Sequence, residues 1–208
     1  MSQTVNKLRT MKHGIIVVVG SGKTGKSTCV HAIVEKYYSD RKKVLLETWD
    51  FDRKIFSMYS VYYDIENVPP GSVVVIEDIG RLFPGRGSQS VTYLSGILSL
   101  LSQNDIIVII SVQSTGVMDK EFFRTQYVLM IHKLVWEFDI KYERVENQAD
   151  QVFANIRIHE AMAMNPDVDQ RSISYCSNFD EILIMDPPTY WKDGVHSHYL
   201  RGSKKVKT

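Results

Sequence analysis

The stretch VVVGSGKTGKSTCVHAIV, residues 17–34, decides the fold. A run of β-branched residues ends at a glycine, two more glycines and a Lys-Ser pair follow, and the pattern then becomes helical. Residues 20–27 fit G-x-x-x-x-G-K-[ST] at every fixed position. Such a loop holds phosphate, because its backbone N–H groups turn inward and the following helix adds the positive end of its dipole. The predicted nucleotide-binding residues are Gly20, Ser21, Gly22, Lys23, Thr24, Gly25, Lys26, Ser27 and Thr28.

Two residues that close this loop have separate predicted roles. Lys26 is expected to reach the β- and γ-phosphate oxygens, and the Ser27 hydroxyl is expected to ligate Mg²⁺. Lys23 is an extra lysine inside the loop, and either a solvated side chain or a second phosphate contact fits it. The loop therefore predicts a site for a nucleoside triphosphate with magnesium.

The rest of the chain alternates short apolar runs with helical patterns, which is typical of an α/β fold with a parallel sheet. The helix predicted over 26–39 has Val30, Ile33, Val34 and Tyr37 on one stripe, and the helix predicted over 143–163 aligns Val145, Ala149, Val152 and Ile156. We predict one domain over 1–188 and a partly irregular, basic tail over 189–208. Strands are expected at 14–19, 43–49, 72–78, 106–113, 127–134, 172–177 and 181–185, with a further helix near 91–103.

Composition limits the classes of function. The 208 residues carry a formal net charge of +1, so any contact with nucleic acid must come from local patches. Cys29 and Cys176 are too few for a disulfide framework and fit no metal-binding spacing, and Cys29 is expected to be a buried thiol. No apolar run is long enough to span a membrane and the N-terminus has no signal-peptide core, so we expect a soluble, intracellular protein.

Two acidic residues end the strand predicted at 72–78. Glu77 and Asp78 fall at the carboxyl end of VVVI, the sheet edge where the phosphate loop also lies. A Mg²⁺–nucleotide site needs a carboxylate on a neighbouring strand, and adjacent strand residues point to opposite faces. One acid can therefore face the metal while the other polarises a water; the alternative is an acidic pair that caps the strand.

The strand predicted at 106–113 is apolar until Ser111, Gln113 and Ser114. A polar side chain at this position can bond the γ-phosphate or the attacking water. Gln113 is the candidate for that contact, and ordinary strand-end polarity is the alternative.

These three segments, in this order, resemble the FtsK–HerA superfamily of DNA-translocating ATPases. The resemblance lies in the phosphate loop, VVVIEDIGRLF (73–83) and IISVQSTGVMDKEFFRTQ (109–126), and runs from about residue 14 to 134. It implies a RecA-like core of the ASCE type that hydrolyses ATP with Mg²⁺. Because the chain is short and has a single domain, it looks like the genome-packaging ATPases of icosahedral viruses with internal membranes. The turreted icosahedral viruses of archaea are the leading suggestion.

The resemblance also assigns roles residue by residue. Lys26 and Ser27 take the phosphate and metal roles, and Gln113 takes the sensor role. Glu77 falls where the family usually has the Asp that holds Mg²⁺, and Asp78 falls where it usually has the catalytic Glu. The pair is inverted in chemical type, so either acid can be the base.

Partners follow from the same resemblance. It implies a homo-oligomeric ring on double-stranded DNA without sequence specificity, a viral capsid or portal-type vertex, and a place in the host-cell cytoplasm or the virion. Each site is completed by an arginine from the neighbouring subunit, with Arg124 the first candidate and Arg81 and Arg86 the alternatives. Tyr190 and Trp191 either stack on bases or anchor the tail. Candidate DNA contacts are Arg86 in the loop 84–90 and the basic tail residues Lys204, Lys205 and Lys207, for which a solvated tail is the alternative.

Two other classes of protein share the phosphate loop. A nucleoside or nucleotide kinase needs an arginine-rich lid, yet 115–165 contains only Arg124, Arg144 and Arg157. A GTPase switch needs Asn-Lys-x-Asp and Asp-x-x-Gly, and neither motif occurs. The motor is therefore the leading hypothesis, the kinase the second, and the switch or assembly protein the third.

Overall fold

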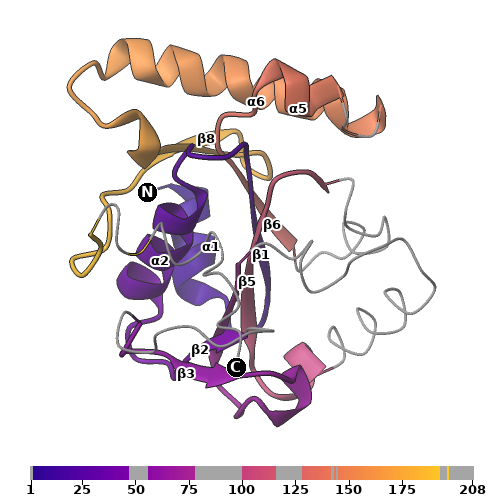
Figure 1. Cartoon of the computed structure of the whole chain (residues 1–208), viewed down its shortest axis with the longest axis vertical. Helices are drawn as coiled ribbons and strands as arrows, with labels where there is room; N and C mark the ends of the chain where they lie inside the picture. The colour runs from indigo at the N-terminus through magenta and orange to yellow at the C-terminus, as the bar shows by residue number, and fades with distance from the viewer. Residues whose placement is uncertain are drawn as a thin grey trace, which may run out of the picture.

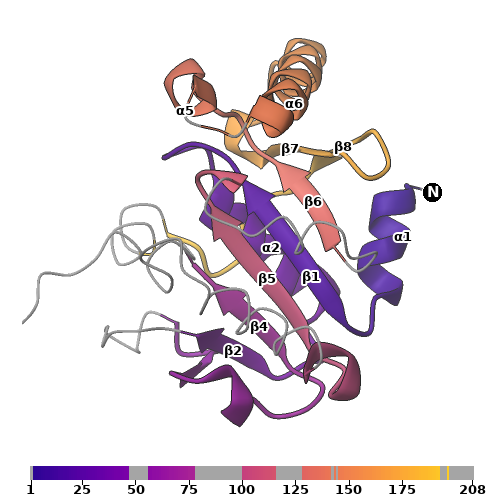
Figure 2. The same ribbon diagram turned by 90° about the vertical axis from the view of Figure 1, so that its right-hand side faces the viewer.

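The structure, a computed structural model, describes residues 2–46, 56–77, 100–115, 128–141, 143, 145–192 and 196. An eight-stranded sheet forms its centre, and Figure 2 shows most of these strands side by side. The strands are β1 Gly14–Val19, β2 Lys43–Leu46, β3 Ser60–Tyr62, β4 Val73–Ile76, β5 Ile107–Val112, β6 Val128–His132, β7 Ile173–Cys176 and β8 Glu181–Ile184.

The strand order is β3-β2-β4-β5-β1-β6-β7-β8. All pairs from β3 to β6 are parallel, and β7 and β8 are added antiparallel at one edge. Every residue of β1 and β5 is buried, which is why both read as continuous apolar runs. β5 lies between β1 and β4, so the phosphate loop after β1 and the acidic residue after β4 both border the end of β5.

The described helices pack on both faces of the sheet. α1 (Gln3–Thr10) and α2 (Lys26–Tyr37) lie on one face (Figure 1), where Val30, Ile33 and Val34 of α2 are buried. The opposite face packs against Ile65 of the 3₁₀ helix η1 (Ile65–Asn67) and against Leu101. α5 (Glu137–Lys141), α6 (Val145–Met164) and the 3₁₀ helix η4 (Gln170–Ser172) follow β6 along the chain.

Most of the predicted elements are confirmed within the described residues, and residues 91–99 of the helix predicted near 91–103 lie outside them. The orientation of α6 is not what its pattern indicates. Val152 and Ile156 are 46% and 49% exposed, whereas Ala154, Ile158 and Ala161 pack with β7 and are buried. The small alanines let α6 approach the strand closely, and this turns the larger aligned residues to solvent. α1, β3 and α5 are absent from the sequence prediction.

Among the described residues no helix is long and apolar enough to cross a membrane. Cys29 and Cys176 are both free and buried, as expected for Cys29.

Glu181 of β8 binds the N-terminus of α1. Its carboxylate accepts hydrogen bonds from Ser2 Oγ at 2.5 Å and from the backbone N–H groups of Gln3 and Thr4 at 2.8 Å each. A carboxylate at a helix N-terminus is stabilised by the orphan N–H groups and the helix dipole. These donors, the Ser2 hydroxyl first, lower the pKa of Glu181 from 4.5 to about 2.

We predict that Glu181→Gln lowers stability at neutral pH and that the difference from wild type disappears in acid. Because the folded pKa lies below the unfolded value, the contribution is complete above pH 4.5 and is lost as the pH falls towards 2. Urea unfolding at several pH values measures the difference, with the exposed Glu66→Gln as the charge control. A difference that stays constant down to pH 2 contradicts the prediction.

Candidate nucleotide-binding site

The phosphate loop after β1 is held where only glycine fits at two positions. A Cβ on Gly20 would lie 2.6 Å from Lys133 Cβ, and one on Gly25 would lie 2.7 Å from the backbone oxygen of Arg171. Gly25 also has φ +88°, which side chains rarely adopt. The backbone N–H of Gly20 donates to Val112 at 3.2 Å. The loop is thus enclosed by the ends of β5 and β6 and by η4.

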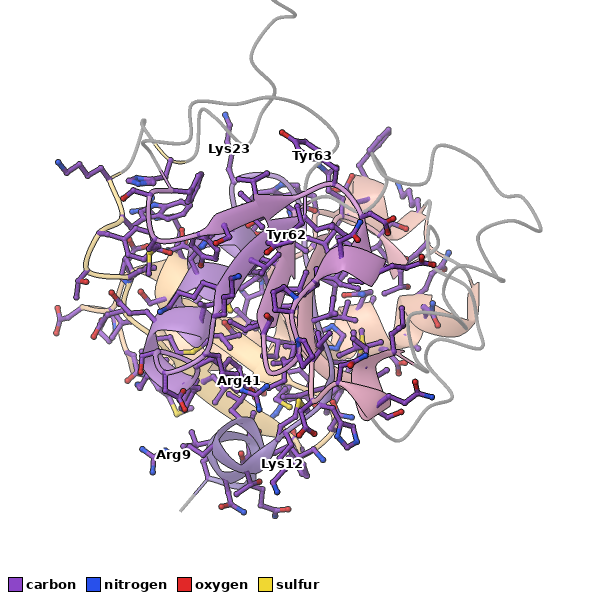
Figure 3. All side chains as sticks on the ribbon, turned by 90° about the horizontal axis from the view of Figure 1, so that it is seen from below. Arg9, Lys12, Lys23, Arg41, Tyr62 and Tyr63 are labelled. Carbon is purple, nitrogen blue, oxygen red and sulfur yellow. The ribbon has the colours of Figure 1, made fainter. Side chains whose placement is uncertain are left out.

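Lys26 lies inside the curve of this loop. Its Nζ donates to the backbone oxygen of Ser21 at 2.8 Å, and Thr24 Oγ1 donates to the same oxygen at 2.8 Å. Lys23, by contrast, is exposed and its side chain projects from the body of the protein (Figure 3). The two lysines therefore differ in position. Lys26 points into the loop, whereas Lys23 has the solvated side chain that was one of its two predicted alternatives.

Ser21 ties the loop to the segment after β6. Its hydroxyl donates to the carboxylate of Asp139 in α5 and accepts from the backbone N–H of Trp136 at 2.7 Å. Its own backbone N–H donates to Leu134 at 2.9 Å. The buried Ser21 therefore fixes the first half of the loop against α5.

Glu77, the residue after β4, faces the loop. Its Oε2 accepts a hydrogen bond from Ser111 Oγ at 2.5 Å and one from Ser27 Oγ at 3.1 Å. The last pair in the register of β4 with β5 is Ile76 with Ile110. The next residue on each strand puts Glu77 opposite Ser111. Glu77 and Ser111 are buried, so the carboxylate is held at the start of α2 rather than left in solvent.

The cluster of Ser27, Glu77 and Ser111 fits magnesium. Mg²⁺ prefers oxygen ligands and binds through one or two carboxylates, waters and substrate phosphates. In the described part of the chain no group of three or more His, Cys, Asp or Glu side chains is placed to hold a metal, and a Mg²⁺–nucleotide site needs none. Ser27 and Glu77 are the residues that would hold the ion.

His31 approaches the other oxygen of Glu77. The His31 Nε2 atom lies 3.5 Å from Glu77 Oε1, and Nδ1 lies 2.7 Å from the Tyr59 hydroxyl. Burial, followed by the charge of His196, lowers the pKa of His31 to about 3, so the imidazole is neutral at physiological pH. Burial also raises the pKa of Tyr59, which keeps its hydroxyl protonated. Since a carboxylate only accepts, the favourable tautomer has Nε2–H towards Glu77 and Nδ1 accepting from Tyr59.

Comparison with solved structures supports the same architecture. The DNA-packaging ATPase B204 of Sulfolobus turreted icosahedral virus matches with a TM-score of 0.50 and 17% identity over 84% of this chain and 98% of that chain. The genome-packaging NTPase B204 of Sulfolobus turreted icosahedral virus 2, solved with AMP, gives 0.52 and 16% identity over 85% and 98%. The same protein solved with ATP-γS gives 0.51 and 15% identity over 85% and 98%.

This chain has the fold of a P-loop NTPase. The resemblance to turreted-virus packaging ATPases that the sequence indicates is confirmed at the level of fold. No family model matches the chain, and no curated protein matches its sequence.

Gln113 follows the last residue of β5, and its side chain is exposed. The turn after it is clamped by Glu143, whose carboxylate accepts from Ser114 Oγ at 2.8 Å and from Thr115 Oγ1 at 2.7 Å. The backbone N–H of Thr115 donates to the same carboxylate at 3.1 Å. Glu143, which lies between α5 and α6, therefore fixes the two residues that follow Gln113. The role of Gln113 as a sensor stays a prediction.

Several predicted residues lie outside the described part of the chain: Asp78, Arg81, Arg86, Arg124, Lys204, Lys205 and Lys207. Tyr190 and Trp191 are described, and both pack against the core cluster that contains α2. Sequence reasoning missed His31 and Glu143, and named Ser111 only as a polar strand end. The one local signal for Ser111 is that it is the first hydroxyl in an otherwise apolar strand.

Proposed function

We propose that the protein is an ATP-hydrolysing motor of the FtsK–HerA type that translocates double-stranded DNA and packages a viral genome into a preformed capsid. The observation that carries the proposal is the contact of Ser27 with Glu77 beside the phosphate loop. It joins the two residues that a Mg²⁺–triphosphate site requires, 50 positions apart in the chain. Similarity in fold to a DNA-packaging ATPase along 98% of that chain supports the choice of DNA as the polymer.

The chemistry is divided among few residues. The loop N–H groups and Lys26 would bind the β- and γ-phosphates, and Ser27 and Glu77 would hold Mg²⁺. The ion, when bound, neutralises charge that develops on the phosphate oxygens. Asp78 accepts the proton of the attacking water, and Gln113 bonds the water or the γ-phosphate. An arginine from a neighbouring subunit in a homo-oligomeric ring, Arg124 before Arg81 and Arg86, stabilises the leaving group.

The remaining parts of the proposal concern partners. Arg86 and the basic residues Lys204, Lys205 and Lys207 contact the DNA backbone, and the motor docks on a capsid or portal-type vertex. Backbone contacts from Lys and Arg give affinity without sequence preference.

We predict that double-stranded DNA of unrelated sequences stimulates ATP turnover several-fold and that the stimulation weakens as salt rises, because counterion release drives backbone binding. The ATPase rate with and without DNA, at several salt and protein concentrations, measures this. A rate per subunit that climbs with protein concentration supports sites shared in a ring. Turnover that ignores DNA but requires a nucleoside acceptor contradicts the motor and favours a kinase.

A further inference from the structure

His31 is the centre of a group of buried and partly buried rings that we call the aromatic cluster: Phe56, Tyr59, Tyr190, Trp191 and His196. Phe56 stacks on the His31 ring with centroids 5.0 Å apart and planes 18° apart, and Trp191 lies 5.5 Å away on a tilt. Tyr59 and Tyr190 meet the ring edge-on at 5.2 and 6.1 Å. His196 closes the cluster by stacking on Trp191 at 5.2 Å.

The cluster joins three separate parts of the chain. His31 is on α2, Phe56 and Tyr59 precede β3, and the other three rings come from the segment after Pro188. The rings of Phe56, Tyr59, Tyr190 and Trp191 all contact the imidazole, so together they leave it little freedom to rotate. The His31 side chain itself is fully buried.

Among the described residues, Glu77 is the polar group outside these rings that His31 faces. Ser27 and His31 are four residues apart on α2 and therefore lie on the same face of the helix, one turn apart. Ser27 donates to Glu77 Oε2, while His31 Nε2 faces Oε1 at 3.5 Å. Within the described residues, Nε2 makes no hydrogen bond of ordinary length, so Glu77 is the acceptor it is aimed at.

We propose that His31 is a positioning residue for Glu77: the aromatic cluster fixes the imidazole, and the imidazole fixes the carboxylate in the orientation that holds Mg²⁺. This inference rests on the proposed role of Glu77 in Mg²⁺-dependent ATP hydrolysis. The physical reason is that a glutamate has three rotatable bonds, and a fixed N–H group facing Oε1 restricts rotation of the carboxylate about the contacts that Oε2 makes. Partners that orient a metal ligand typically change metal affinity or activity by about 10–100-fold when removed.

The test compares four variants in steady-state ATPase assays at one fixed Mg²⁺ concentration below saturation. His31→Phe keeps a ring in the cluster but removes both nitrogens, and His31→Gln restores a donor near the position of Nε2. Tyr59→Phe removes only the hydroxyl that faces Nδ1. Val34→Ala, a buried change on α2 one turn beyond His31, controls for lost stability.

We expect His31→Phe to lower kcat by about 10–100-fold while KM for ATP changes less than about 2-fold, because the phosphate loop is untouched. His31→Gln should recover most of the loss, and Tyr59→Phe should lower kcat by a smaller factor. His31→Phe should have no further effect when Glu77 is already Gln, since it acts through that residue. A kcat for His31→Phe no lower than that of Val34→Ala, or independent effects of the two changes, overturns the proposal.

A crystal structure of His31→Phe separates this proposal from the proposed function. If wild type lacks turnover, the motor is wrong, and the position of Glu77 still decides the role of His31. We expect the carboxylate to leave Ser111 and Ser27 in the variant. If Glu77 keeps both contacts, His31 does not position it, whatever the activity of the wild type. Should His31→Phe fail to fold, the same structure is determined for Tyr59→Phe.

Discussion

Lys26→Ala is expected to weaken binding of a non-hydrolysable ATP analogue by at least about 100-fold and to abolish turnover. The lysine ammonium lies inside the loop and donates to the backbone oxygen of Ser21 at 2.8 Å. When nucleotide binds, it can exchange this contact for hydrogen bonds to the phosphate oxygens. Hydrogen bonds to charged groups contribute about 1.5–3 kcal/mol each, so losing contacts to both the β- and γ-phosphates accounts for this factor. Isothermal titration calorimetry of the analogue with Mg²⁺ measures the affinity.

Two lysines serve as matched controls for Lys26→Ala. Lys36→Ala removes the same charge from the exposed far end of α2, and Lys23→Ala removes it from the exposed position in the same loop. We expect Lys36→Ala to bind like wild type and Lys23→Ala to lose much less than Lys26→Ala. Equal losses at Lys23 and Lys26, or wild-type affinity for Lys26→Ala, would contradict the assignment of the loop.

Glu77→Gln is expected to leave nucleotide binding within a few-fold of wild type but to lower hydrolysis by about 100-fold at low Mg²⁺. The amide oxygen of glutamine can still accept from Ser27 and Ser111, so the local packing is kept. The neutral side chain, however, no longer attracts the cation. We therefore expect a higher Mg²⁺ concentration for half-maximal turnover, measured by magnesium titration of the ATPase rate.

Asp78→Asn distinguishes the two acids. If Asp78 is the base, its amide variant binds nucleotide but stays inactive at every Mg²⁺ concentration, since general-base catalysis is typically worth 10²–10⁴-fold. Glu77→Gln, in contrast, should regain part of its rate as Mg²⁺ rises. The catalytic assignment is wrong if neither variant slows hydrolysis.

The central strands and α2 could be predicted from sequence because their signals are local. β1 and β5 are buried along their whole length, so each appears as an uninterrupted apolar run. α1 could not be predicted in this way, because six of its eight residues are not buried. The partner that holds its N-terminus is Glu181, which is 179 residues from Ser2 in the chain.

The sequence names the residue types of the candidate site, but it gives only part of the contacts among them. The choice between Glu77 and Asp78 for the metal depends on which strand face α2 covers. Val73 and Val75 share a core cluster with α2, and alternation then puts Glu77 on that face. Until the packing of α2 is known, the sequence leaves both acids equivalent.

His31 shows the limit of sequence reasoning more clearly. A histidine within an apolar helix indicates neither a metal site nor a catalytic group by itself. Its proposed role depends on Tyr59 and Trp191, which are 28 and 160 positions away, and on Glu77 at the end of β4. Only tertiary packing brings these residues together.

A crystal structure with a non-hydrolysable ATP analogue and Mg²⁺ tests the central claim most directly. We predict that the triphosphate lies in the loop from Gly20 to Ser27, with Lys26 on the β- and γ-phosphates. The Glu77 carboxylate should lie within about 4–5 Å of the ion, bound to it directly or through one water. Glu77 remote from the terminal phosphate, or an acceptor cavity where the attacking water should be, would contradict the motor.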